Sequence, residues 1–377
     1  MATPDQILED ALQRARELAN QPVVTDKGIL ERIEFVARCL SNRAGVRMLI
    51  TCALAKIHRP EVDIRKPYTE IGDSDAYSGR GEYDEKYVAS FTSKYQLPVN
   101  ATTAFLTPGF RTINVPLAPP LKISGTPKKM YEGVIQLLDD VYRGNLSAMD
   151  LLVETLRQLL VIQQEQASRI TQLLNELRTT QNSVPLSSEE TVNLIQQHLR
   201  SPKSSRLPVL VIAAAYLAAS DKIGERVKRL YAHNAADLQT GAIGDIEITL
   251  ADDDNVVTSY EMKAKDVTKA DVDLAVQKVA LSGRHIDNYI FITTGAIDKD
   301  VSEYATSLYR ETGGIEFAIL DCIGFLRHFL HFFHRLRLDF LEQYQNLILS
   351  EPESAVNQPL KEVFLALRRA AEIDSSA

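Results

Sequence analysis

The fold of the second half of the chain is decided by residues 244–265, GDIEITLADDDNVVTSYEMKAK. Apolar and polar residues alternate on both sides of ADDDN, an acidic and polar run of the kind that forms turns. This pattern predicts two neighbouring antiparallel strands, at 244–250 and 256–265, joined as a hairpin.

One face of the predicted hairpin carries charged side chains. In the second strand, Glu261 and Lys263 alternate with apolar residues, so the two-residue period of a strand places both on one face. In the first strand, Asp245 and Glu247 share a face, and Asp245 reaches the same end as Glu261 if the hairpin pairs in register. The sequence therefore predicts that two carboxylates and an ammonium converge.

These groups suit the hydrolysis of a phosphodiester bond with Mg²⁺ as cofactor. Two carboxylates and a main-chain carbonyl form an oxygen cage that suits this ion, and we expect Asp245, Glu261 and the carbonyl of Met262 to provide it. The ion lowers the pKa of a bound water and screens charge on the phosphate. We expect Lys263 to orient or deprotonate the water and to stabilise the transition state. The alternative is an ordinary solvated strand, because Glu and Lys two residues apart are common.

Outward from the hairpin, the sequence predicts a mixed α/β sheet covered by helices. The predicted helices lie at 206–230, 268–283, 299–312 and 322–347, and further strands at 288–294 and 315–321. The stretch SPKSSRLP at 201–208 is a predicted domain edge, and residues 348–377 add one helix and a polar tail.

The region before residue 200 is predicted to be mainly helical. Apolar residues recur at helical spacing at 5–19, 28–57, 128–143, 147–181 and 187–200. The last of these opens with a capping box from Ser187 to Glu190. Repeated prolines between 60 and 127 break any long helix there and leave a short one near 83–95.

The charged hairpin matches a known pattern. Asp245, fifteen further residues and then Glu261-Met262-Lys263 resemble the D-(x)n-E-x-K pattern of the PD-(D/E)XK nuclease superfamily, with Gly244 in place of its proline. Residues 207–277 resemble type II restriction endonucleases of the SacI family in the segments LPVLVIAAAYLAASDKIGERV, GDIEI, EMKAK and VQKV. The stretches YSGRGEYDEKYVASF and LPVNATTAFLTPGFR also match that family's layout.

The resemblance implies Mg²⁺-dependent cleavage of both DNA strands at a short sequence, by a homodimer that recognises a palindrome. A cognate DNA methyltransferase is the functional partner that we expect, since it would protect the host. The implied domains are a helical region at 1–200 for DNA recognition or dimerisation, a nuclease core at 201–347, and a C-terminal helix and tail at 348–377. Two alternatives stay open: a superfamily nuclease with a repair or modification-dependent role, and a catalytically silent DNA-binding protein.

Four residues near the hairpin are secondary candidates. Glu225, on the predicted helix 206–230, is a further candidate metal ligand, with Asp221 as its alternative. Gln277, on the next helix, is a candidate for a hydrogen bond to the site or to a phosphate. Glu247 is a candidate ligand or supporting carboxylate, and Lys265 a candidate phosphate contact. For Glu225, Gln277 and Lys265, the alternative is an ordinary solvated side chain.

Cations and amides in the proline-rich region are candidates for DNA contact. Arginine and asparagine are well suited to bidentate recognition of guanine and adenine. The candidates are Arg65, Lys66, Arg80, Asn100 and Arg111. The alternative is a surface loop held by prolines.

Composition narrows the class of protein further. The net charge of −8 argues against a generic nucleic-acid coat, although basic groups can still gather in one cleft. Three cysteines without metal-ligand spacing, Cys39, Cys52 and Cys322, lie in apolar stretches and predict buried free thiols and a reducing compartment.

Three histidines, His328, His331 and His334, recur at three-residue steps in an apolar stretch that is predicted to be one helix. We expect this helix to pack against the sheet or a dimer partner, in preference to forming a zinc site. With no signal-peptide pattern and no long apolar run, we expect a cytoplasmic protein.

Overall fold

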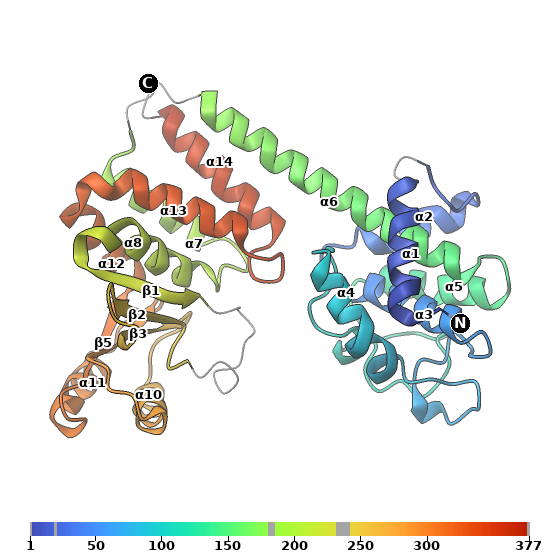
Figure 1. The fold of residues 1–377 in the computed structure, drawn as a ribbon, viewed down its shortest axis with the longest axis horizontal. Coiled ribbons are helices and arrows are strands. Elements are labelled where there is room, and N and C mark those ends of the chain that lie inside the picture. Colours follow the sequence, from blue (N-terminus) through green and yellow to red (C-terminus); the bar gives the residue numbers. More distant parts are fainter. Residues whose placement is uncertain (1, 19–20, 180–184, 231–241, 375–377) are drawn as a thin grey trace. The chain divides into compact units, whose positions relative to one another are not determined.

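The computed structural model describes residues 2–18, 21–179, 185–230 and 242–374 (Figure 1). The chain divides into two compact units, Met1–Ser168 and Arg169–Ala377. This boundary lies earlier than the predicted one at 200/201. The reason is the helix α7 (Ser188–Leu199), whose Val192 and Ile195 are buried in the apolar core of the second unit.

The first unit is helical, as the sequence predicts. Its helices are α1 (Pro4–Glu17), α2 (Lys27–Ala37), α3 (Ala44–His58), α4 (Ala89–Lys94), α5 (Lys128–Tyr142) and the first part of α6 (Ala148–Thr179). Two short 3-10 helices lie at Thr69–Ile71 and Ala104–Leu106, and the π-helix η2 spans Gly79–Val88.

Two predictions for this unit are wrong in detail. The single helix expected at 28–57 is two helices, α2 and α3. Between them, the side chain of Asn42 accepts a hydrogen bond from the backbone N–H of Ala44, a local contact that competes with helical hydrogen bonds. The short helix expected near 83–95 is the end of η2 followed by α4.

The second unit contains a five-stranded mixed sheet flanked by helices, which confirms the predicted fold class. The strands are β1 (Glu225–Leu230), β2 (Ile246–Leu250), β3 (Val256–Lys263), β4 (Asn288–Thr293) and β5 (Glu316–Asp321), in that order across the sheet. The first three are antiparallel, while β4 is parallel to β3 and to β5. The predicted hairpin is therefore confirmed.

Helices cover both faces of this sheet. They are α8 (Leu207–Ile223), α10 (Lys269–Ser282), α11 (Lys299–Glu311), α12 (Cys322–Phe332), α13 (Arg337–Ser350) and α14 (Gln358–Asp374). Figure 1 shows α10 and α11 on the opposite side of the strands from α8 and α13. Successive strand residues point to opposite faces of the sheet, so each face packs its own apolar core. Ile246 and Ile292 are buried on the α8 side, and Phe291 and Phe317 are buried on the α10 side.

Two predicted helices of this unit are also wrong in detail. The helix expected at 206–230 ends at Gly224, which has a left-handed backbone with φ of 69°, and the chain continues as β1. The helix expected at 322–347 is α12 and α13, separated by the 3-10 turn His334–Leu336. The capping box at the start of α7, from Ser187 to Glu190, is confirmed.

Two further sequence predictions can be compared with the structure. Cys39, Cys52 and Cys322 are free thiols, as predicted, and Cys52 and Cys322 are buried. The predicted burial of Cys39 is wrong, because this residue lies beyond the end of α2 and is partly exposed. His331 contacts Glu189 at 2.8 Å, while His328 stacks on Phe332. The histidines of this helix therefore take part in packing and surface contacts. Among the described residues, no helix is both long and apolar enough to cross a membrane.

Candidate active site

Asp245, Glu261 and Lys263 lie at one end of the β2–β3 hairpin. The register pairs Ile246 with Tyr260, so the next position along the hairpin brings Asp245 opposite Glu261. One carboxylate oxygen of Asp245 accepts a hydrogen bond from the backbone N–H of Met262 at 2.7 Å. The structure thus places Asp245 beside the backbone of Met262, and Lys263 beside Glu261, at the same end of the hairpin.

Both carboxylate oxygens of Glu261 have cationic neighbours. Lys263 Nζ lies 3.3 Å from Oε1, and Lys278 Nζ, from α10, lies 3.4 Å from Oε2. The hydroxyl of Tyr289 lies 3.1 Å from Oε2 and 3.2 Å from the carbonyl oxygen of Ile243, and its hydrogen can be donated to either. Contacts from three sides thus orient the Glu261 carboxylate.

Lys263 is held by two carboxylates. Besides Glu261, its ammonium contacts Asp271 at 3.1 Å, and Asp271 also forms the capping box of α10 with Thr268. Burial tends to lower the pKa of Lys263, but the hydrogen bond to Asp271 and the charge of Glu261 outweigh it and raise the pKa. Lys263 is therefore a protonated ammonium here, which favours charge stabilisation over deprotonation of water.

The side chain of Glu247 holds the chain segment that leads into the β2–β3 hairpin. It is 1% exposed, and its Oε1 accepts hydrogen bonds from the backbone N–H of Ile243 at 3.0 Å and from Arg284 at 3.1 Å. Of its two predicted roles, the geometry favours the supporting one, because these contacts fix the chain just before Asp245.

Gly244 stands where the superfamily pattern has proline, and the packing explains why a side chain is excluded. A Cβ at this position would lie 2.6 Å from both the side-chain oxygen of Ser259 and the backbone oxygen of Tyr260. These distances are too short for non-bonded atoms, so the two strands would have to separate next to Asp245.

We therefore expect Gly244→Ala to lower the stability of the second unit by about 1–3 kcal/mol, the usual cost of overpacking. Hydrogen exchange of the β2–β3 hairpin and the thermal midpoint measure this. Gly81→Ala is the control, because its added carbon meets nothing closer than 3.4 Å. Equal stability of the Gly244 and Gly81 variants would contradict the close approach of the strands.

The structure does not bring Glu225 to this site. Glu225 lies on strand β1 opposite Leu250, not on a helix, because α8 ends at Gly224. Its carboxylate forms a hydrogen bond with the hydroxyl of Tyr216. The hydroxyl oxygen of Tyr216 lies 2.9 Å from the hydroxyl oxygen of Tyr260. Since Tyr260 and Glu261 are neighbours in one strand, they point to opposite faces. Burial raises the pKa of Glu225 by more than the bond to Tyr216 lowers it.

Two other candidates near the hairpin are at the surface. Gln277 is exposed on α10, and its neighbour Lys278 is the residue that reaches Glu261. Adjacent helical residues differ by about 100° in direction, so a one-position difference changes the face. Lys265 is exposed just beyond the end of β3, where its carbonyl accepts a hydrogen bond from Thr293 at 2.8 Å.

In the first unit, two of the candidate DNA-contacting cations are paired with acids. Arg65 contacts Asp63 at 2.9 Å and Asp139 at 3.0 Å and lies over the ring of Tyr142. Lys66 contacts acids on the same loop at 2.7 and 2.8 Å, and these hydrogen bonds raise its pKa. Such contacts give these cations a structural role and do not support their prediction as DNA contacts.

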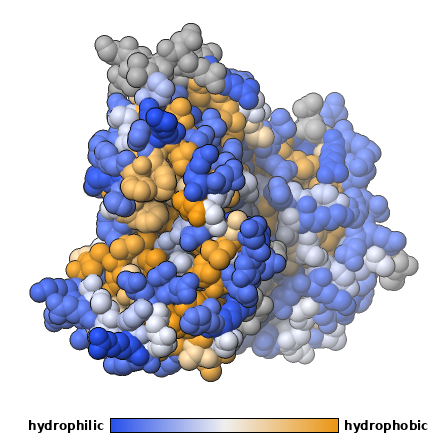
Figure 2. Space-filling view, turned by 60° about the vertical axis from the view of Figure 1, so that its left-hand side comes forward, coloured by the Kyte–Doolittle hydropathy of each residue, from blue (hydrophilic) through white to orange (hydrophobic). Residues whose placement is uncertain are grey.

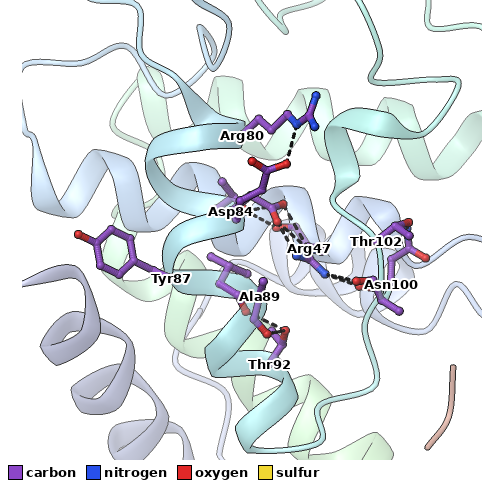
Figure 3. A network of polar contacts seen from close by, with 12 residues as sticks. Arg47, Arg80, Asp84, Tyr87, Ala89, Thr92, Asn100 and Thr102 are labelled. Atoms are coloured by element: carbon purple, nitrogen blue, oxygen red, sulfur yellow. Dashed lines mark hydrogen bonds and ion pairs between the residues drawn. The ribbon is translucent and has the colours of Figure 1, made fainter. Parts of the chain in front are cut away.

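The other three candidates are more accessible. Arg80 is half exposed and pairs with Glu85 at 2.7 Å, and Arg111 is exposed. The backbone oxygen of Asn100 accepts a hydrogen bond from Arg47 at 2.6 Å, while its amide donates to Thr102 at 3.1 Å. Figure 3 shows Arg47 between Asp84 and Asn100 in this region.

The residues at the hairpin fit a divalent ion that retains several waters. Among the residues described, no three His, Cys, Asp or Glu side chains are grouped to hold an ion by themselves. The carboxylates of Asp245 and Glu261 with the carbonyl of Met262 would supply three oxygens. Mg²⁺ is commonly bound through one or two carboxylates with water in its remaining positions.

Sequence reasoning missed three residues that shape this site: Asp271, Lys278 and Tyr289. Asp271 and Lys278 are seven residues apart, which is about two turns of a helix, so they lie on one face of α10. An acid and a lysine at this spacing on the helix after the hairpin were the available signal. Tyr289 had none, because its contact depends on how β4 pairs with β3.

Comparison with known families covers the same segment. Residues 183–296 match the model of the SacI restriction endonuclease C-terminal domain, which includes β2, β3, α10 and β4. No curated protein matches the chain. This segment of the chain is thus similar to the C-terminal domain of SacI restriction endonucleases.

Proposed function

We propose that the protein is a type II restriction endonuclease that cuts both strands of DNA at a fixed short sequence with Mg²⁺. The observation that carries the proposal is the convergence of Asp245, Glu261 and Lys263 at one end of the hairpin, inside the segment that matches the restriction endonuclease domain.

The side chains have separate tasks in this proposal. Asp245, Glu261 and the carbonyl of Met262 hold the divalent ion, which supplies Lewis acidity and positive charge beside the phosphate. Asp271 keeps Lys263 protonated and close to Glu261. The ammonium of Lys263 then stabilises negative charge that develops on the phosphate in the transition state.

Cleavage of both strands at a palindrome requires two copies of the site, so we propose a homodimer. Figure 2 shows that hydrophobic residues reach the surface between hydrophilic ones. In the second unit, Leu281 is 88% exposed and Phe332 is 70% exposed. Large exposed apolar side chains of this kind favour association. The helical region before residue 200 would supply DNA recognition or dimer contacts, and a cognate methyltransferase would protect the host.

Digestion of a sequenced plasmid tests the function. We expect the wild type to give discrete fragments in Mg²⁺, whose mapped ends share one short sequence, and to lose activity in EDTA. The variant Asp245→Ala should give no fragments, which excludes a contaminating nuclease, whereas Glu225→Gln should cut normally. Cutting that depends on methylation or free ends, or DNA binding in Ca²⁺ without cutting in Mg²⁺ or Mn²⁺, would favour the alternatives. Unchanged cutting by Asp245→Ala would contradict the assignment of the site.

A further inference from the structure

Tyr289 is a buried tyrosine on β4 whose hydroxyl reaches the candidate active site. Its side chain is fully buried, and its ring packs against the rings of Phe291 and Phe317, with centroids 5.2 and 5.7 Å away. The register pairs Tyr289 with Ser259 on β3 and with Phe317 on β5, so a strand lies on each side of it. A closely packed core leaves such a ring little freedom to move, so the sheet fixes the position of the hydroxyl.

The hydroxyl of Tyr289 lies beside both chain segments that carry the candidate metal ligands. Its oxygen is 3.1 Å from Oε2 of Glu261 on β3 and 3.2 Å from the carbonyl oxygen of Ile243, two residues before Asp245. A carboxylate is a stronger hydrogen-bond acceptor than a neutral carbonyl, so the hydroxyl hydrogen favours Glu261. The carboxylate of Glu261 is therefore oriented by a donor that is itself fixed in the core.

The direction of this carboxylate matters for a divalent ion. Mg²⁺ requires nearly ideal octahedral geometry, so each protein oxygen has to point correctly. The hydrogen bond from Tyr289 is made to Oε2 of Glu261, while Lys263 lies beside Oε1. Groups that hydrogen-bond to a metal-binding carboxylate fix its direction, and their loss typically lowers metal affinity or activity about 10–100-fold.

We propose that Tyr289 is a positioning residue for the divalent ion, because its hydroxyl holds Glu261 in the direction that the ion requires. This inference rests on the proposed function and adds to it a residue that supports the proposed metal site. Tyr289 contacts neither the ion nor the DNA in this role and acts through Glu261. Loss of the hydroxyl should therefore weaken metal binding but preserve most of the reaction rate once the site is saturated with metal.

Replacement of Tyr289 by phenylalanine tests the proposal, because it removes the hydroxyl and keeps the ring in the core. Binding of Mn²⁺ to the DNA-free protein is measured by electron paramagnetic resonance. We expect Tyr289→Phe to bind Mn²⁺ about 10–100-fold more weakly than the wild type. In single-turnover cleavage, the variant should need correspondingly more Mg²⁺ for its half-maximal rate and should approach the wild-type rate at saturating Mg²⁺.

Tyr344→Phe is the matched control. Tyr344 is also a fully buried tyrosine of the second unit, and its hydroxyl oxygen lies 3.1 Å from Nδ1 of His198. This variant also removes a buried hydroxyl, so it shows what a general loss of stability does to metal binding. We expect its Mn²⁺ affinity to equal that of the wild type. Thermal midpoints measured without metal compare the stability that each variant loses.

The outcomes separate this inference from the proposed function. Wild-type Mn²⁺ affinity in folded Tyr289→Phe, or an equal loss of affinity in Tyr344→Phe, would overturn the role of Tyr289 and leave the proposed function intact. If the wild type cuts DNA but binds Mn²⁺ too weakly to measure without DNA, an unchanged half-maximal Mg²⁺ concentration in Tyr289→Phe would overturn it. A wild type that neither binds Mn²⁺ nor cuts DNA would overturn the proposed function and this inference with it.

Discussion

Replacement of Lys263 by alanine is expected to reduce the rate of DNA cleavage by about 10²–10³-fold, the usual effect of losing one group that stabilises transition-state charge. The ammonium lies 3.3 Å from Glu261 and 3.1 Å from Asp271, and its raised pKa keeps it charged. Single-turnover cleavage in Mg²⁺ measures the loss, with DNA affinity in Ca²⁺ determined separately.

Two variants sharpen this prediction. Asp271→Asn leaves Lys263 in place but removes one charge that orients it, so we expect a smaller loss of rate. Lys299→Ala removes an exposed lysine of α11 and should leave the rate unchanged. A normal cleavage rate in Lys263→Ala would show that the ammonium takes no part in the reaction.

The second large effect concerns stability. Asp84, on η2, is fully buried and pairs with Arg47 on α3 at 2.5 Å (Figure 3). The guanidinium of Arg47 also donates to the carbonyls of Asn100 and Ala101. Asp84→Ala would leave a buried cation without its counter-charge, which typically costs about 3–5 kcal/mol. We expect the first unit to unfold at lower temperature and its amides in 44–58 and 79–94 to exchange faster.

The control for this effect lies one residue away. Glu85 pairs with Arg80 at 2.7 Å, but both side chains are about half exposed. Exposed ion pairs contribute about 0–1 kcal/mol, so Glu85→Ala should change stability little. Similar destabilisation by Asp84→Ala and Glu85→Ala would contradict the importance of burial. A chain with two units need not unfold in one step. Calorimetry therefore measures the unfolding temperature, and hydrogen exchange shows which unit unfolds.

Local periodicity was enough to predict the strands β2, β3, β4 and β5, but not β1. The alternation in 244–265 identified both strands, the turn between them and the shared face of Asp245, Glu261 and Lys263. These features depend on the two-residue period of a strand, which is visible in sequence. The pairing of two strands that are neighbours in the sequence could therefore be predicted.

The errors arose where structure depends on a single turn or on helix phase. Gly224 ends α8 and releases residues 225–230 into a strand, which moves Glu225 to the opposite face from Glu261. The contact of Lys278 with Glu261 was not predicted, because it depends on the exact phase of α10, where one position changes direction by about 100°. The contact of Arg65 with Asp139 could not be predicted, because the two residues are distant in sequence. Tertiary pairs of this kind leave no local pattern.

The central claim is that Asp245 and Glu261 hold one divalent ion at the end of the hairpin. Diffraction from crystals grown with Mn²⁺, collected for its anomalous signal, tests this most directly. We predict a single ion within coordinating distance of a carboxylate oxygen from each residue, and its loss in Asp245→Ala. An ion bound to neither residue, with the two carboxylates turned apart, would contradict the account.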